Sequence, residues 1–173
     1  MSCDLTAGYS LGCRDSQGGV HYVIALQLEH VETITKTSGE VTSITVANGE
    51  RGWKFEQEEE VAMFEENPIG NRENGTYRVE ENLSIVLNDG SKETRNFINL
   101  LAKNRIVFVV AKNDGTFVLA GETRGLMMAD GSGGSGTSKE DRSGFTLPFT
   151  GTEKELAPTV DPTIIAGLLV PAS

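Results

Sequence analysis

Apolar and polar residues alternate along several stretches of this chain, and a period of two is typical of a half-buried β-strand. Residues 20–28 place five apolar side chains on one face of an extended segment. Residues 77–87 repeat the pattern over a longer stretch, with Glu81 as the exception. We therefore expect strands at 20–28 and 77–87, each with one face toward a core.

Shorter segments also have the composition of strands. Residues 41–47 are rich in β-branched residues and lie between Ser-Gly and Asn-Gly turn signals, which favours a hairpin or a meander. Residues 106–110 form a continuous apolar run, typical of a strand covered on both faces, and an Asn-Asp-Gly turn leads into a returning strand at 116–120. Residues 145–149 alternate again, and Pro148, which lacks an N–H, predicts an edge strand or a bulge there.

One segment has helical spacing instead. Apolar residues recur at intervals of three and four between Phe97 and Leu101. Ser91 is placed to cap the N-terminus of this helix, and Glu93 in the first turn interacts favourably with the helix dipole. We expect one amphipathic helix at 92–103, packed on the side of a sheet.

The number and order of these elements indicate the fold class. A chain of 173 residues has the length for one well-filled core, so we expect a single domain over 1–173. Many strands and one helix, at about 92–103, predict a mainly β fold: an antiparallel β-sandwich or split barrel with that helix on its flank and long loops. The domain includes an N-terminal arm at about 1–18, a long loop at about 129–144 and a C-terminal arm at about 156–173.

The segment 129–144 is polar and holds five glycines, which indicates a long exposed loop. Residues 131–136 match the G-x-G-x-x-G pattern of a dinucleotide site. Such a site needs a strand before it and a helix after it, whereas residues 137–144 are polar and lack apolar periodicity. We therefore expect no nucleotide cofactor.

The chain is acidic, with a net charge of −10 and a pI near 4.7. A protein of this charge repels nucleic acid rather than binding it. Residues 50–66 carry seven glutamates against two cations. Trp53 and Phe55 share one face of a strand expected here, and we expect that face to be buried. The opposite, solvated face holds Lys54, Glu56, Glu58 and Glu60.

Candidate catalytic and metal-binding groups are few. Cys3, Cys13, His21 and His30 lack the paired spacing of a zinc finger or ribbon, so we expect free thiols, with a zinc site as the alternative. Both histidines fall in or beside an expected strand, which favours ordinary sheet histidines over a nucleophilic site. The glutamates on one strand face offer no environment that would separate their pKa values. We expect no catalytic, metal-binding or cofactor-binding residues, and hence no enzyme.

The sequence pattern also indicates no targeting signal and no membrane-spanning segment. The N-terminus shows no basic region followed by an apolar stretch, so we expect synthesis in the cytoplasm. The longest nearly apolar run, residues 164–170, is far shorter than the roughly 20 residues that span a bilayer. We expect no interaction with a membrane.

A series of short motifs runs in order through nearly the whole chain. In the first half they are Cys3-Asp4-Leu5-Thr6-Ala7-Gly8, Cys13-Arg14-Asp15-Ser16 with Gly18-Gly19, and Arg72-Glu73-Asn74-Gly75-Thr76. In the second half they are Thr94-Arg95 with Leu100-Leu101-Ala102, the hairpin from Asn113 to Leu119, Ala120-Gly121 with Gly125-Leu126, and Gly144-Phe145-Thr146-Leu147 with Gly151 and Glu153-Lys154. Together these motifs resemble tail proteins of bacteriophages that infect Bacteroidetes and related bacteria.

The resemblance implies a structural virion protein, the major tail tube subunit, with a β-sandwich or split-barrel fold and one flanking helix. Such subunits form homo-hexameric rings that stack into a tube. The lumen is commonly acidic, so that viral DNA passes without specific binding, and long loops reach into the next ring. The resemblance further implies contacts with the tape measure and terminator proteins. It implies a location in the virion tail, after assembly in the bacterial cytoplasm, and no catalytic residues.

Two sets of residues become candidates for these roles. The candidate acidic residues of the lumen are Glu56, Glu58 and Glu60, with Glu59 on the opposite strand face as a contrast. The candidate inter-subunit residues of the loop are Asp130, Gly131, Gly133, Gly134, Gly136, Lys139, Glu140, Asp141 and Arg142.

Two alternatives stay open beside the tail tube. One is another phage β-sandwich protein, such as a tail terminator or a capsid decoration protein, because these share one architecture. The other is a β-sandwich module that binds a carbohydrate or a host partner. Such modules usually expose aromatic side chains, so an exposed Trp53 beside other aromatics would favour the module.

Overall fold

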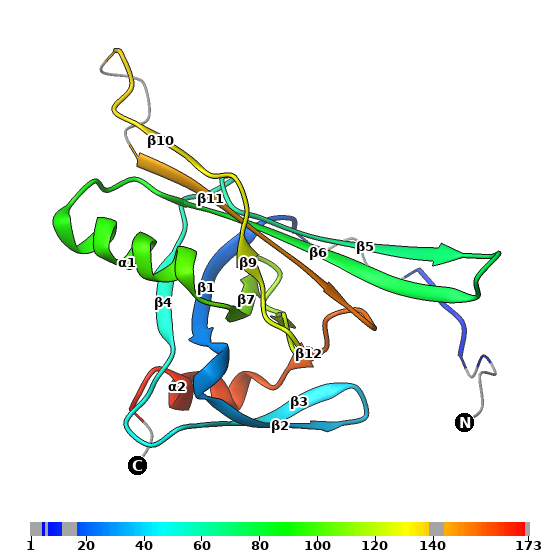
Figure 1. Ribbon diagram of the computed structural model, residues 1–173. Helices are drawn as coiled ribbons and strands as arrows, with labels where there is room; N and C mark the ends of the chain where they lie inside the picture. The colour runs from blue at the N-terminus through cyan, green and yellow to red at the C-terminus, as the bar shows by residue number, and fades with distance from the viewer. Residues whose placement is uncertain (1–4, 6, 12–16, 139–143, 172–173) are drawn as a thin grey trace.

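The computed structural model describes residue 5 and residues 7–11, 17–138 and 144–171 (Figure 1). Its strands form two sheets, and the prediction of a mainly β fold with one principal helix is confirmed. Cys3, Cys13 and the loop residues 139–143 lie outside the described residues.

The larger sheet has seven strands in the order β2-β3-β12-β8-β7-β1-β4. Their bounds along the chain are β1 (Val20–Gln27), β2 (Val31–Thr37), β3 (Glu40–Val46), β4 (Trp53–Glu56), β7 (Ile106–Lys112), β8 (Phe117–Ala120) and β12 (Thr159–Val160). Neighbouring strands are antiparallel except β12 and β3, which are parallel. A 3-10 turn, η1 (Leu28–His30), connects β1 to β2.

The smaller sheet has the order β10-β11-β6-β5, and β9 also pairs with β11. Its strands are β5 (Met63–Asn71), β6 (Thr76–Leu87), β9 (Met127–Met128), β10 (Ser132–Gly134) and β11 (Gly144–Glu153). The strands β5 and β6 form one long hairpin that extends well past the other strands (Figure 1).

Two apolar clusters fill the two sides of the larger sheet. Between the sheets, the Phe108 ring of β7 meets the Phe149 ring of β11 edge to face, with centroids 4.8 Å apart. Val107 and Val109, on the other side of β7, belong to a second cluster with Leu168 near the C-terminus. The apolar run of β7 is therefore buried on both faces, as its sequence predicts.

The helix α1 (Lys92–Lys103) has the predicted bounds. Its start is capped locally, because the Ser91 side chain accepts the N–H of Thr94 at 3.3 Å. Leu101 is buried against the cluster between the sheets, whereas Phe97 and Leu100 on the same helix stay exposed. The sheet thus covers only part of the apolar surface of α1.

The strand with Pro148 lies inside its sheet and is not an edge strand, because β11 pairs with β6 on one side and with β9 and β10 on the other. A bulge nevertheless occurs beside it. Three residues separate Met128 from Ser132, whereas two separate their partners Phe149 and Thr146. Pro148 lies at this irregularity, where the ladder does not require its N–H.

The C-terminal segment belongs to the body of the fold. After β12 the chain forms a 3-10 turn, η2 (Pro162–Ile164), and a short helix, α2 (Ile165–Leu168). Ile165 and Leu168 are buried, and the carbonyl of Leu168 accepts the N–H of Gly52 at 2.7 Å. This bond anchors the segment that leads into β4.

Candidate functional site

The acidic segment forms a turn rather than a continuous strand face. The strand β4 ends at Glu56, which lies 3.2 Å from the ammonium of Lys54. Glu58 follows outside the strand, and the chain reverses around Glu59 and Glu60, where Glu60 has a φ of 61°. The prediction of alternating faces is therefore wrong beyond Glu56. All four glutamates are exposed, and we call residues 56–60 the acidic turn.

Gln57 explains why the strand ends there. Its backbone N–H still donates to the carbonyl of His21 on β1, at 3.1 Å. Its side-chain Oε1 accepts the N–H of Val86 on β6, at 2.7 Å. The chain is thus tied to both sheets at one residue, and it leaves the larger sheet directly afterwards to begin β5.

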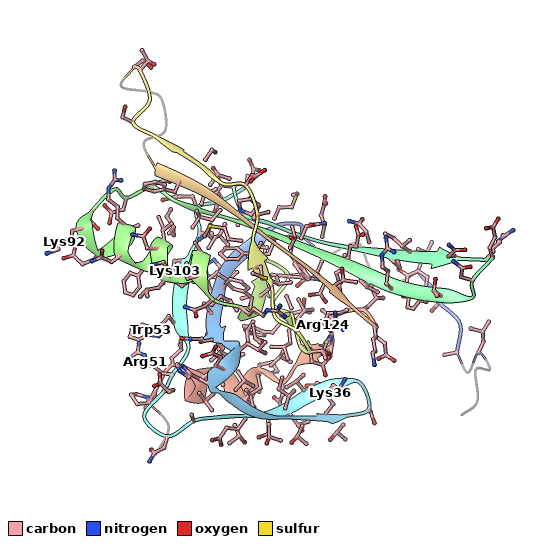
Figure 2. All side chains as sticks on the ribbon, in the orientation of Figure 1. Lys36, Arg51, Trp53, Lys92, Lys103 and Arg124 are labelled. Carbon is pink, nitrogen blue, oxygen red and sulfur yellow. The ribbon has the colours of Figure 1, made fainter. Side chains whose placement is uncertain are left out.

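Trp53 is exposed, contrary to the prediction, because β4 is the last strand of its sheet and lies at an edge. Its side chain is 47% exposed beside Phe97 and Leu100 of α1, which are 41% and 57% exposed. The Arg51 guanidinium lies 4.2 Å from the Trp53 ring centroid (Figure 2). The centroids of the Phe97 and Trp53 rings are 6.2 Å apart. We call these residues, together with Phe55, the aromatic groove; its volume is about 180 Å³.

The glycine-rich segment is not wholly irregular, because it contains the short strand β10. Gly133 pairs with Phe145, and a Cβ at position 133 would lie 2.3 Å from Cδ1 of that ring. Glycine is thus required here by the contact with Phe145, not by a phosphate group. Gly131, Gly134 and Asp130 lie on or beside this strand and are exposed. Gly136 follows it with a φ of 72°, while Lys139, Glu140, Asp141 and Arg142 lie outside the described residues.

Most of the outer half of the β5–β6 hairpin, residues 67–78, is paired strand. Asn71 pairs with Thr76 across a four-residue turn in which Gly75 has a φ of 62°. The face of the hairpin that continues the core carries Pro68 and Tyr77, and both are exposed. This part of the sheet therefore extends beyond the core with both faces uncovered.

A buried carboxylate lies between the sheets. Glu81 of β6 is 1% exposed, and its Oε2 accepts the N–H of Gly121 at 2.8 Å. Burial raises the pKa of Glu81 to about 7, against the lowering effect of the Gly121 hydrogen bond and with a smaller raising effect from the charges of Glu153 and Glu66. Glu81 interrupts the apolar alternation of residues 77–87, and the sequence pattern does not indicate its partner. Its hydrogen bond is with a backbone N–H, which is a structural role.

Within the described residues, no group of three or more His, Cys, Asp or Glu side chains is arranged to hold a metal ion. His30 lies 3.3 Å from Glu50 in an ordinary surface pair.

Among the residues that the structure describes, no helix has both the length and the apolar character needed to cross a bilayer.

The fold and these surfaces define a two-sheet β protein with projecting hairpins, an acidic turn and uncovered apolar side chains. Comparisons of the chain with protein-family models, with curated proteins and with solved structures found no match.

Proposed function

We propose that this chain is a structural subunit of a phage tail tube, which assembles with copies of itself into stacked hexameric rings. The observation that supports this most is the uncovered outer half of the β5–β6 hairpin. A two-stranded hairpin alone is marginally stable in water. Within one copy nothing packs on the hairpin face that carries Pro68 and Tyr77, and a neighbouring subunit would cover this face.

The acidic turn supports the second part of the proposal, passage of the genome. Glu56, Glu58, Glu59 and Glu60 are exposed together on one connection. When such turns are repeated around a ring, they present acidic groups to the lumen, and like charges keep DNA from binding to the wall. DNA is then a transient, non-specific partner, and the subunit is not an enzyme.

The β10–β11 hairpin supports contact with another ring. Its glycine-rich strand projects from the sheet at the end opposite the β5–β6 tip (Figure 1). We propose that its connecting residues, with the charged side chains from Lys139 to Arg142, meet a neighbouring subunit in the assembled tail. The tape measure and terminator proteins are the other proposed partners, and the virion tail is the proposed location.

A second candidate function is a β-sandwich binding module, and the exposed Trp53 beside Phe97 favours it. The geometry of the ring favours a protein ligand over a sugar. The Arg51 guanidinium lies over the Trp53 ring and the Phe97 ring lies tilted beside it, so the ring does not offer a bare platform for stacking. Trp, Arg and Phe are enriched in protein interfaces, which is compatible with self-assembly as well.

Negative-stain microscopy of the purified protein tests the proposal. The tube function predicts long hollow assemblies, whereas a terminator would stop at single rings and a binding module or decoration protein would stay unassembled. A variant with residues 69–78 replaced by Asn-Gly leaves Pro68 and Val79 paired beside a two-residue turn. It should fold, by circular dichroism, but form no tubes. Glu73→Gln, which keeps the full hairpin, is the control and should assemble normally.

A further inference from the structure

The first residues of the chain form an apolar face without a partner in their own subunit. Leu5, Ala7, Tyr9 and Leu11 occupy alternate positions in the sequence, and Thr6, Gly8 and Ser10 lie between them. In an extended segment these four side chains share one face. In the structure Leu5, Tyr9 and Leu11 are 98%, 90% and 88% exposed, and the described residues among 5–11 belong to no sheet. This is a strand pattern without a sheet.

The aromatic groove offers an edge that such a segment fits. The strand β4 is the last in the larger sheet, so its outer backbone groups have no neighbouring strand among the described residues. Trp53 and Phe55 lie on the side of β4 that faces α1, where Phe97 and Leu100 are exposed. On the opposite side of β4 are the charged Lys54 and Glu56. An added strand would therefore need one apolar and one polar face.

We propose that residues 5–11 of one copy add as a strand to the β4 edge of a second copy and cover its aromatic groove. Leu5, Tyr9 and Leu11 then contact Trp53, Phe97 and Leu100, while the polar face of the arm lies beside Lys54 and Glu56. Backbone hydrogen bonds to β4 supply affinity, and the alternating side chains supply the register. The described residues of the arm carry no charge, which suits the apolar centre of the groove.

The positions of the two parts favour a second copy as the occupant. Residues 7–11 lie on the side of the protruding β5–β6 hairpin, whereas β4 and α1 lie at the other end of the molecule (Figure 1). A contact between different surfaces of identical subunits is heterologous, and such contacts continue from copy to copy into rings or filaments. The inference thus rests on the proposed self-assembly and assigns it one contact.

The single tryptophan makes the contact measurable, because Trp53 lies in the groove itself. The full-length protein carrying Leu5→Ser, Tyr9→Ser and Leu11→Ser, whose own arm no longer competes for the groove, is titrated with a synthetic peptide of residues 4–12. We expect the Trp53 emission to shift saturably to shorter wavelength and amide hydrogen exchange in β4 to slow. A peptide with Leu5, Tyr9 and Leu11 replaced by Ser should bind more than about tenfold more weakly, and one with Ser10→Thr should bind normally. Leu100→Ser in the protein should also weaken binding, at an exposed position that the fold does not need.

The outcomes separate this contact from the tube function. No emission shift with the native peptide, or an equal shift with the triple-serine peptide, overturns the inference. In the full-length protein, shielding of Trp53 that does not change with protein concentration also overturns it, because the arm would then bind its own subunit. Tubes with a solvent-exposed Trp53 would refute the arm contact and leave the tube function standing. A saturable shift without tube formation would support the contact and refute the tube.

Discussion

The carboxylate of Glu81 and the backbone N–H of Gly121 join the two sheets, with 2.8 Å between Oε2 and the nitrogen. Glu81 projects from β6, and Gly121 directly follows β8 of the larger sheet. Glu153 on β11 accepts the N–H groups of Thr123 and Arg124 in the same turn, at 3.1 and 3.2 Å. Two carboxylates of the smaller sheet therefore hold the turn that follows β8 of the larger sheet. The bond from Glu81 also satisfies the N–H of the buried Gly121, which would be costly to leave unpaired.

Stability should fall with rising pH because of Glu81. Its pKa is raised from 4.5 to about 7 in the folded protein, so the folded state binds this proton more tightly than the unfolded state does. The contribution is fully present below pH 4.5 and is lost as pH rises through about 7. Glu81→Gln keeps an oxygen for Gly121 and removes the titration. At pH 8 it should raise the free energy of unfolding, by up to a few kcal/mol at about 1.4 kcal/mol per pKa unit.

The measurement is urea unfolding of both proteins between pH 5 and pH 8, with Glu65→Gln as the control at an exposed position of β5. The difference between wild type and Glu81→Gln should grow with pH, while the control should follow wild type. A difference that is independent of pH would show that Glu81 does not titrate in this range.

The contact between Gly133 and Phe145 predicts an unequal response of two adjacent glycines. A Cβ at position 133 would overlap the Phe145 ring, whereas a Cβ at Gly134 meets no atom within 4 Å. Gly133→Ala should therefore cost about 1–3 kcal/mol of unfolding free energy, as expected for overpacking. Gly134→Ala should change it by less than about 0.5 kcal/mol. Equal effects in denaturant unfolding would mean that β10 does not pack on Phe145.

Features that depend on residues close together in the sequence were predictable from it. The helix begins after Ser91 because its own hydroxyl caps the first turn, and the apolar run of β7 indicates burial on both faces. Alternation likewise places Trp53 and Phe55 on one face. Alternation does not show that β4 lies at a sheet edge, because the position of a strand in its sheet depends on the order of all the strands. Trp53 is exposed because β4 lies at that edge.

The acidic turn and the long hairpin illustrate the same limit. The alternating pattern of the sequence continues through Glu58 and Glu60, but the strand ends before them. It ends there because Gln57 bonds to Val86, which lies 29 positions away in the sequence. Asn67 and Pro68 are typical of loops, yet they pair with Glu80 and Val79 in a strand. Cross-strand partners decide such segments, and local composition does not encode them.

The connection between β10 and β11 should be dispensable for folding and needed for assembly. Gly134 pairs with Gly144, so replacing residues 135–143 by Asn-Gly leaves a closed hairpin. Circular dichroism and thermal unfolding should match wild type. Tubes should become shorter or rarer in negative stain, because the variant lacks the residues proposed to contact a neighbouring subunit. Scrambling the order of residues 137–142 at constant length is the control for loop length. Full-length tubes from the shortened protein would contradict this role.

Reversing the charge of the acidic turn should slow DNA passage without preventing tube assembly. Glu56, Glu58 and Glu60 are exposed, so Lys at these positions leaves the core unchanged. Lysines repeated around each ring would bind phosphates and release counterions, which retards the genome more strongly at low salt. The control variant carries Glu29→Lys, Glu32→Lys and Glu155→Lys, the same change in charge at exposed positions elsewhere. Slower ejection from virions with the first variant alone supports a lumen position for the turn. Equal ejection rates, or a tube reconstruction with the turn on its outer wall, would contradict it.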